Sequence, residues 1–470
     1  MMRSFFLKEI SDSISGQIIG RNAENKSITG ISIDSRTLSA GQLFIAIKGP
    51  YFDGHQFLQQ ACEAGAAAAV VSKIDKSIDL IQVLVKDTFL ALGKLGQLNR
   101  LAFQGLVFAI TGSCGKTSVK EMLSAILAEQ FNVLSTLGNL NNGYGVPLTL
   151  SQLEPVHDYA VVELGTSSPG EISYIAGLTQ PDIAILINAA EAHLEGLGSV
   201  EGVAKEKGYI LDASGDKGVA ILNYDDSFYS EWLARTKTVI GRKTVAFSLN
   251  NSDADCYASD IKTSDKGMDF ILNVSGSECP VNLGFFGLHQ VSNACCAAAA
   301  AFAAGIKLEV IAQGLENAHP YQRRGMRYKL SGVWGKRVTV FDETYNANPK
   351  AMRASIDLLS MCSGKRIMVF GDMLELGRLS SDRHRDIGVY AKQKGIDYFA
   401  GFGALAELAC AAFTKDSRHF SSKAELVDWI KTLIRSESGH TVSVLVKGSK
   451  GMEMYDVVRS LVGPEYEGER

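Results

Sequence analysis

The sequence lacks the segments that place a protein in a membrane or direct it to secretion. No run reaches the ~18 consecutive apolar residues of a membrane-spanning helix, and the apolar run in the opening MMRSFFLKEI is too short for a secretory signal. The net charge is only −4, which excludes a bulk attraction to nucleic acid or to an anionic membrane surface. We therefore expect a cytoplasmic monomer whose partners are small molecules, with no nucleic-acid partner and no membrane insertion.

Cysteine motifs are missing as well. The chain has eight cysteines but no C-x-x-C pair, and Cys295 and Cys296 fall inside an alanine-rich segment of helical composition. This spacing supports neither a zinc site nor a disulfide framework, so we interpret these two thiols as small core residues. Such use of cysteine fits a reducing compartment.

Length and composition indicate a large α/β protein with several domains. With 470 residues, 46% of them hydrophobic, the chain can form about three domains of ~150 residues each. Strand-like runs alternate with helical patterns, as in mainly parallel sheets covered by helices. We predict an N-terminal α/β domain over residues 1–104, a central domain with a mainly parallel sheet over 105–328, and a Rossmann-like domain over 329–470.

One glycine is missing from the segment ITGSCGKTS, residues 110–118. The G-x-x-x-x-G-K-[ST] signature of phosphate-binding loops needs a glycine five places before Gly115, where this chain has Ile110. What remains is a buried strand, a glycine loop and an amphipathic helix, so backbone N–H groups, Lys116 and the Thr117 hydroxyl could meet phosphate and Mg²⁺. We interpret this loop as a nucleotide site; the alternative is a surface turn with a solvated lysine.

Further candidates lie near the ends of other strands and on one helix. Glu163 ends the run YAVVEL and His193 follows the run IAILIN, so both could reach the loop edge of a parallel sheet and bind Mg²⁺. Lys207 falls on the apolar face of a helical segment, where a lysine must be paired, neutralised or modified. Each has a plainer explanation: Glu163 and His193 as solvated or core-satisfied groups, and Lys207 as a lysine that snorkels past the apolar stripe.

A polar segment, FDETYNANPKAM, follows a strand of the third predicted domain. Asp342 and Glu343 end this strand, and Asn346 and Asn348 place amides beside a proline, which suits a loop that binds a polar ligand. The alternative is a polar turn that caps the next helix. A G-x-G-x-x-A pattern at GFGALA lacks the acidic residue expected about twenty places on, so we do not predict a dinucleotide cofactor.

Several of these segments together resemble the Mur ligases, the ATP-dependent amide-bond-forming enzymes of peptidoglycan assembly. The loop T-G-S-C-G-K-T is similar to that family's T-G-[ST]-x-G-K-T, which also lacks the first glycine. GNLNNGYGVPLTL, ETYNANP, and GDMLELG with the later His384 resemble the branch of the family that adds D-alanyl-D-alanine. The N-terminal DSRTLSAGQLFIAIKGPYFDGHQF resembles the uridine-nucleotide-binding domain of these enzymes.

The resemblance implies a reaction and its cofactors. A ligase of that branch joins D-alanyl-D-alanine to UDP-N-acetylmuramoyl-tripeptide through an acyl phosphate, in the cytoplasmic stage of peptidoglycan synthesis. The implied cofactors are ATP, two Mg²⁺ ions and a lysine carbamate formed from CO₂ on Lys207. Two alternatives stay open: another ligase of the family, such as MurE, and a non-catalytic nucleotide-binding scaffold.

The resemblance also implies roles for individual residues. The implied catalytic residues are Lys116, His193, Lys207 and Arg327. The implied metal ligands are Thr117, Glu163, His193 and carbamylated Lys207. The implied ATP contacts are Gly112, Ser113, Cys114, Gly115, Lys116, Thr117, Ser118, His289, Asn293, Arg327, Asp342 and Glu343. The implied contacts to the UDP-linked and dipeptide substrates are Ser35, Arg36, Lys48, Asp53, Gly54, Asn139, Asn142, Asn346, Asn348, Lys447 and Ser449.

Overall fold

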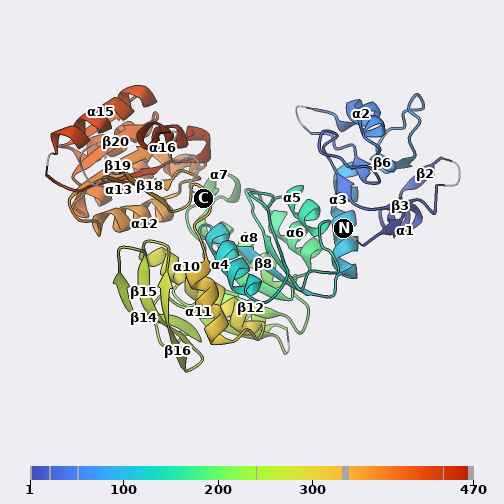
Figure 1. Cartoon of the computed structure of the whole chain (residues 1–470), viewed down its shortest axis with the longest axis horizontal. Helices are drawn as coiled ribbons and strands as arrows, with labels where there is room; N and C mark the ends of the chain where they lie inside the picture. Colours follow the sequence, from blue (N-terminus) through green and yellow to red (C-terminus); the bar gives the residue numbers. More distant parts are fainter. Residues whose placement is uncertain are drawn as a thin grey trace.

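The computed structural model describes residues 3–20, 23–49, 52–239, 241–330, 338–437 and 439–463; residues 331–337 and 464–470 of the predicted third domain lie outside this range. The described chain forms three α/β units in succession, each built around one large sheet (Figure 1). The N-terminal and C-terminal units lie at opposite ends of the molecule, with the central unit between them. The predicted fold class is confirmed.

The N-terminal unit contains a five-stranded sheet in the order β2-β7-β6-β5-β4, in which β2 is antiparallel to β7 and the other pairs are parallel. A separate antiparallel pair is formed by β1 and β3. The strands are β1 (Phe5–Phe6), β2 (Gln17–Ile19), β3 (Ser27–Ile28), β4 (Ile31–Ser32), β5 (Leu43–Ile45), β6 (Ala68–Val71) and β7 (Gln82–Leu84). The helices are α1 (Leu7–Ser13), α2 (Leu58–Glu63) and α3 (Thr88–Ala102), with a 3₁₀ turn η1 (Gly54–Phe57).

The central unit contains a nine-stranded sheet in the order β16-β15-β14-β13-β12-β11-β8-β10-β9. Its pairs are parallel from β9 to β14, and β15 and β16 are added antiparallel at one edge. The strands are β8 (Leu106–Thr111), β9 (Val133–Ser135), β10 (Tyr159–Glu163), β11 (Ile183–Leu186), β12 (Val219–Asn223), β13 (Lys243–Phe247), β14 (Cys256–Thr263), β15 (Met268–Val274) and β16 (Ser277–Leu283). The helices are α4 (Lys116–Ala128), α5 (Gly145–Leu150), α6 (Glu171–Thr179), α7 (Leu194–Leu197), α8 (Val200–Gly208), η2 (Tyr209–Leu211), α9 (Tyr229–Lys237), α10 (Leu288–Ala303) and α11 (Leu308–Asn317).

The C-terminal unit contains a six-stranded sheet in the order β17-β18-β22-β19-β20-β21, parallel except for β17. The strands are β17 (Met326–Leu330), β18 (Val338–Glu343), β19 (Lys365–Gly371), β20 (Tyr398–Phe402), β21 (Ser417–Phe420) and β22 (Val442–Lys447). The helices are α12 (Pro349–Ser360), η3 (Gly377–Leu379), α13 (Ser380–Gln393), α14 (Ala406–Phe413), α15 (Lys423–Ser436), η4 (Lys450–Met452) and α16 (Tyr455–Val462). The predicted boundary at residue 328 therefore falls inside β17, which pairs with β18 of this sheet.

The carboxyl end of β8 is a point where the strand order of the central sheet reverses. The chain leaves β8 through α4 to reach β9 beyond β10, and it later places β11 on the other side of β8. In an open α/β sheet, ligands bind outside the carboxyl ends of the strands at such a reversal. Because β8 is buried from Val107 to Thr111, its sequence is a continuous apolar run rather than an alternating one. Among the described helices, none has the length and apolar composition needed to cross a membrane.

Helix α11 packs so closely on α4 that it needs a glycine at the contact. A Cβ atom on Gly314 would lie 2.3 Å from the Cα atom of Ile126 in α4. We expect Gly314→Ala to destabilise the central unit by about 1–3 kcal/mol, because the two helices would have to separate. Gly177 of α6 is the matched control: a Cβ there meets no atom within 4 Å, so Gly177→Ala should stabilise by about 0.5–1 kcal/mol. The midpoints of urea unfolding measure both, and an unchanged midpoint for Gly314→Ala would contradict this packing.

Candidate active site between the central and C-terminal units

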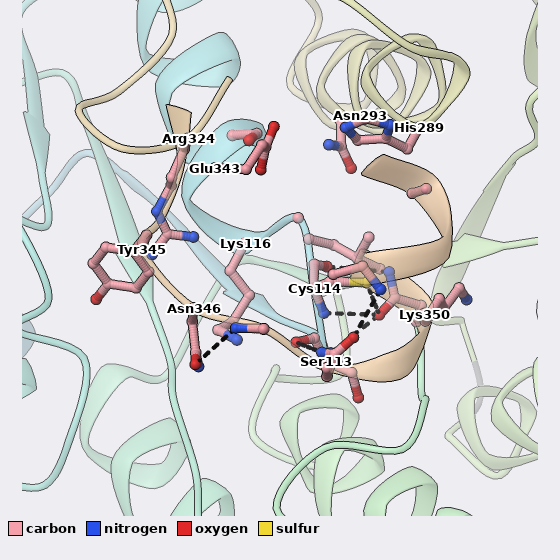
Figure 2. A pocket seen from close by; sticks show the side chains of 18 of the residues that line it. Ser113, Cys114, Lys116, His289, Asn293, Arg324, Glu343, Tyr345, Asn346 and Lys350 are labelled. Carbon is pink, nitrogen blue, oxygen red and sulfur yellow. Dashed lines mark hydrogen bonds between the residues drawn. The ribbon is translucent and has the colours of Figure 1, made fainter. Parts of the chain in front are cut away.

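A cavity of about 680 Å³ lies at the carboxyl end of β8, where the central unit faces the C-terminal unit (Figure 2). Its lining includes the loop between β8 and α4, the start of α10 and the segment that joins β18 to α12, together with residues at the ends of β10, β11 and β22. These segments are far apart in the chain, and the fold brings them together. The cavity is therefore the candidate site.

The loop before α4 has the geometry of an anion site. Gly115 has a φ of 87°, which favours glycine, and a Cβ atom there would lie 2.5 Å from Asn293 Oδ1. The backbone N–H groups of Ser113 and Cys114 both donate to Asn188 Oδ1, each at 3.1 Å. Two loop amides thus converge on one oxygen beside the N-terminus of a helix, an arrangement that also suits a phosphate oxygen.

Lys116, the first residue of α4, is half-buried beside this loop. Its Nζ atom donates to the carbonyl oxygen of Gly112 at 2.7 Å. Burial lowers the pKa of Lys116, Glu163 acts in the opposite direction, and the nearby Arg324 lowers it further. A bound anion would reverse this shift, because an opposite charge favours the charged form of a lysine.

Glu163, the last residue of β10, lies beside the start of α4 and is hydrogen-bonded to it. It is 1% exposed, and Thr117 Oγ1 donates to its Oε2 atom at 2.7 Å. Asn141 Nδ2 donates to its Oε1 atom at 2.7 Å. Sequence reasoning identified Thr117 and Glu163 but selected Asn139 and Asn142 instead of Asn141. Asn142 lines the cavity and caps α5 by accepting from Tyr144 and Gly145 N–H groups; Asn139 is outside the lining.

His193 and Lys207 lie near the same edge of the sheet. His193 lines the cavity, has a φ of 55°, and its Nδ1 atom is 2.5 Å from Oε2 of Glu375 in the C-terminal unit. Burial lowers the pKa of His193, and Glu375 opposes this shift. Lys207 is 1% exposed on α8 and is not part of the cavity lining. Burial, and next the charge of Lys116, lower the pKa of Lys207 well below its usual range.

The start of α10 forms another side of the cavity. His289 and Asn293 lie side by side there (Figure 2), and Asn293 Nδ2 donates to Gln290 Oε1 at 3.0 Å. Burial lowers the pKa of His289, while Glu343 across the cavity raises it. An uncharged imidazole beside amide groups suits a polar, uncharged ligand group better than a phosphate.

The C-terminal unit contributes acidic and amide groups. Burial raises the pKa of Asp342 to about 6, although Thr344 donates to it through both its N–H and its hydroxyl. Glu343 Oε2 is 3.3 Å from Lys447 Nζ, and both residues line the cavity. Among the described residues, Asp342 Oδ2 and Glu343 Oε1 are buried without a hydrogen-bond partner. Glu343 Oε1 can therefore meet a ligand donor in the cavity, whereas Asp342, a predicted ATP contact, is outside the lining.

Asn346 and Asn348 also line the cavity. Asn348 both caps a helix and faces the cavity, which were the two alternatives for this segment. Its Oδ1 atom accepts from Ala351 N–H as the N-cap of α12, and its Nδ2 atom lies 3.5 Å from the carbonyl oxygen of Ser113 in the phosphate-binding loop. The segment therefore caps a helix and also contacts the nucleotide-type loop. Ser449 is outside the lining; its hydroxyl lies 3.4 Å from Ala347 O and accepts from Leu374 N–H.

Comparison with known proteins agrees with this arrangement. Three family models match the chain: "Mur ligase family, catalytic domain" over residues 27–90, "Mur ligase middle domain" over 110–301, and "Mur ligase, glutamate ligase domain" over 326–450. The chain is 39% identical over 461 residues to the UDP-N-acetylmuramoyl-tripeptide--D-alanyl-D-alanine ligase of Escherichia coli K12, covering 98% of this chain and 99% of that relative.

The chain belongs to the Mur ligase family.

Two solved structures place the fold of this Mur ligase among its relatives. MurF from Acinetobacter baumannii matches with a TM-score of 0.91 and 33% identity, covering 98% of this chain and 99% of that one. MurF ligase from Thermotoga maritima, solved in complex with ADP, matches with a TM-score of 0.81 and 25% identity, covering 92% and 96%. The resemblance seen in the sequence motifs is confirmed.

One arginine of this Mur ligase lies elsewhere than the sequence motif indicated. Arg327 is outside the cavity lining: its Nη2 atom donates to Asp265 O, and its guanidinium lies 4.1 Å from the ring centre of Phe286. Arg324 lines the cavity instead, 3.6 Å from the ring centre of Tyr345, and is directed toward the loop that carries Lys116 (Figure 2). Among the described residues its Nε atom is buried without an acceptor. The sequence signal for Arg324 was the arginine pair immediately before Gly325.

The residues selected in the N-terminal unit gather away from this cavity. Ser35 and Arg36 follow β4, and Lys48 and Asp53 follow β5, so both pairs lie beyond the carboxyl ends of adjacent parallel strands. Lys48 and Asp53 form an antiparallel bridge. Gly54 lies against the backbone there, since a Cβ atom would be 2.7 Å from the carbonyl oxygen of Ile47. None of these five residues is part of the lining of the large cavity.

Proposed function

We propose that this Mur ligase joins D-alanyl-D-alanine to UDP-N-acetylmuramoyl-tripeptide at the expense of ATP, in the cytoplasmic stage of peptidoglycan synthesis. The observation that carries the proposal is the full-length similarity to a relative with that named activity, together with a cavity formed by a phosphate-binding loop and the C-terminal unit. We further propose that the enzyme acts as a monomer. Residues 1–104 would bind the UDP-linked substrate, 105–328 ATP, and 329–470 the dipeptide.

ATP would bind with its phosphates at the loop before α4 and its adenine near α10. The half-buried Lys116 provides a partner for phosphate oxygens, and the amides of Ser113 and Cys114 would provide two more by exchanging Asn188 Oδ1 for a phosphate oxygen. His289 and Asn293 provide polar groups near the adenine ring. In support, the MurF of Thermotoga maritima has been solved in complex with ADP.

Magnesium ions fit the donors at this edge of the sheet. Mg²⁺ prefers oxygen ligands and commonly takes one or two carboxylates plus substrate phosphates, so the adjacent Thr117 hydroxyl and Glu163 carboxylate suit a first ion. His193, with carbamylated Lys207, would hold a second. Bound there, the ions would neutralise negative charge on phosphate oxygens. No described group of three or more His, Cys, Asp or Glu side chains forms a metal cage, so phosphate and water would complete the coordination.

The chain itself supplies position and charge rather than a covalent nucleophile. The terminal carboxylate of the tripeptide attacks the γ-phosphate of ATP and releases ADP; the dipeptide amine then attacks the acyl phosphate carbonyl and releases phosphate. Lys116 and Arg324 would stabilise the negative charge on the transferred phosphoryl group. Because the cavity is formed between two units, docking of the C-terminal unit would also exclude water from the acyl phosphate.

The substrates would contact residues on all three units. The UDP-linked substrate would contact Ser35, Arg36, Lys48, Asp53, Gly54, Asn139 and Asn142. The dipeptide would contact Asn346, Asn348, Lys447 and Ser449. Of these four, Ser449 would act from behind the cavity surface, because it is outside the lining while the other three form part of it. Glu343 would offer an acceptor to the nucleotide, while Asp342 would act from behind the cavity surface.

The direct test is phosphate release from ATP by the purified protein with Mg²⁺ and UDP-N-acetylmuramoyl-tripeptide. We expect release to require D-alanyl-D-alanine and to be near background with single D-alanine, because the dipeptide amine is the second substrate. Release with another amino acid in place of the dipeptide would indicate a sister ligase. ATP binding without turnover in any mixture would indicate a scaffold.

Arg324, not Arg327, should be the arginine that acts on ATP. We expect Arg324→Met to lower kcat by about 100-fold or more, the usual effect of removing one donor to a developing charge. Arg327→Met is the matched control and should stay within about threefold, because its side chain contacts Asp265 and Phe286 outside the cavity. Steady-state phosphate release at varied ATP measures both, and the reverse order of effects would contradict the assignment.

Carbamylation of Lys207 can be tested by chemical rescue. A carbamate forms on an uncharged amine, and burial holds the pKa of Lys207 low enough to supply one. Lys207→Ala should abolish turnover, and added short carboxylates such as acetate should restore part of it by replacing the carbamate oxygens. Full activity of the variant without any additive would rule out this function for Lys207.

A further inference from the structure

A loop of the C-terminal unit reaches across to the proposed metal residue His193. The loop is the GDMLELG segment, residues 371–377, which begins with the last residue of β19 and ends with the first residue of η3. Within it, Glu375 Oε2 lies 2.5 Å from His193 Nδ1, and Glu375 O accepts from Glu195 N–H at 3.2 Å. The segment is therefore joined to the His193 loop by both its side chain and its backbone.

The GDMLELG segment is held rigidly on its own side. His384, which is fully buried, accepts from Met373 N–H through Nε2 at 3.0 Å and donates from Nδ1 to Ser380 O at 2.6 Å. Ser449 Oγ accepts from Leu374 N–H at 2.9 Å. These bonds hold the two residues before Glu375 within the C-terminal unit.

Both partners of the contact have unusual backbone conformations. His193 has a φ of 55° and Glu375 a φ of 63°, in the left-handed region that side chains other than glycine rarely adopt. Such conformations persist only where the surrounding structure enforces them, and they concentrate at functional sites. A separate ion pair, between Glu191 of the His193 loop and Arg383 of α13, lies at the same boundary between the two units.

The contact with Glu375 determines which nitrogen of His193 is available to a metal ion. An ionised carboxylate can only accept a hydrogen bond, so Nδ1 of His193 must carry the proton and Nε2 is left with its lone pair. A histidine that binds a metal typically donates its other N–H to a carboxylate in this way, which fixes the tautomer and makes the ring a better ligand. Here the carboxylate comes from a different unit of the protein.

We propose that Glu375 is a positioning residue that completes the His193 metal site only when the C-terminal unit is docked. This inference rests on the proposed function, since it concerns the second Mg²⁺ of that reaction. The proposal implies an order of events. The site would bind the metal with full affinity only after the unit that binds the dipeptide has closed. The enzyme would then form little acyl phosphate while the C-terminal unit is open to water.

Binding of Mn²⁺ in the presence of ADP, followed by electron paramagnetic resonance, tests this without turnover. We expect Glu375→Ala to weaken the His193-dependent Mn²⁺ site by about 10-fold or more, the usual effect of losing such a partner. Glu375→Gln should recover part of the loss, because its amide oxygen can still accept from Nδ1. The same Glu375→Ala change made in His193→Ala should have no further effect on Mn²⁺ binding.

Arg383→Gln is the matched control, because it removes the Arg383–Glu191 ion pair between the same two units and leaves the His193 contact intact. We expect its Mn²⁺ affinity to stay within about twofold of the wild type, with all variants keeping the wild-type unfolding midpoint. Equal losses for Glu375→Ala and Arg383→Gln, or a loss that persists in His193→Ala, would overturn the positioning function. A wild-type protein that binds no Mn²⁺ with ADP would instead contradict the proposed function itself.

Discussion

The site depends on the burial of charged side chains at the carboxyl ends of the central sheet. Lys116 and Lys207 are both desolvated, the charge of Lys116 further lowers the pKa of Lys207, and Glu163 is held between Thr117 and Asn141. Burying charge is costly unless it is paired or neutralised. A nucleotide with its metal ions would supply the missing opposite charges. The unfavourable burial of these groups in the free protein would thereby strengthen the binding of the charged substrate.

The same constraint explains why the site is shared between units. The loop before α4 can hold phosphates alone, but the acyl phosphate must be protected from water on the side where the amine arrives. The segment between β18 and α12 provides that cover, and Asn348 brings it to within hydrogen-bond distance of Ser113. Two further contacts, between His193 and Glu375 and between Glu191 and Arg383, join the C-terminal unit to the loop that follows β11. The interface between the central and C-terminal units therefore both positions the two units and forms the candidate active site.

Sequence reasoning identified the parts of the site that follow from strand ends and loop signatures. Lys116, Thr117, Glu163 and His193 all follow β8, β10 or β11, so a parallel sheet alone predicts that they meet. Sequence reasoning failed where a shift of a few residues along the chain decides whether a side chain reaches the cavity. Arg324 and Arg327 are three places apart, yet Arg324 precedes β17 and reaches the cavity, while Arg327 lies within β17 and contacts Phe286. Asn141 was missed for a related reason. Three asparagines lie in the same loop, and only the folded shape of the loop shows that Asn141 is the one that donates to Glu163.

The central claim, that the chain activates the tripeptide as an acyl phosphate, can be tested by labelling the terminal carboxylate of the UDP-linked tripeptide with ¹⁸O. In that mechanism one carboxylate oxygen becomes the bridge to phosphorus and leaves with the phosphate when the dipeptide amine attacks. Mass spectrometry of the released phosphate should therefore find one ¹⁸O atom per phosphate formed in the presence of D-alanyl-D-alanine. Unlabelled phosphate, released while the amide product forms, would show that the carboxylate never joined the phosphoryl group and would contradict the account.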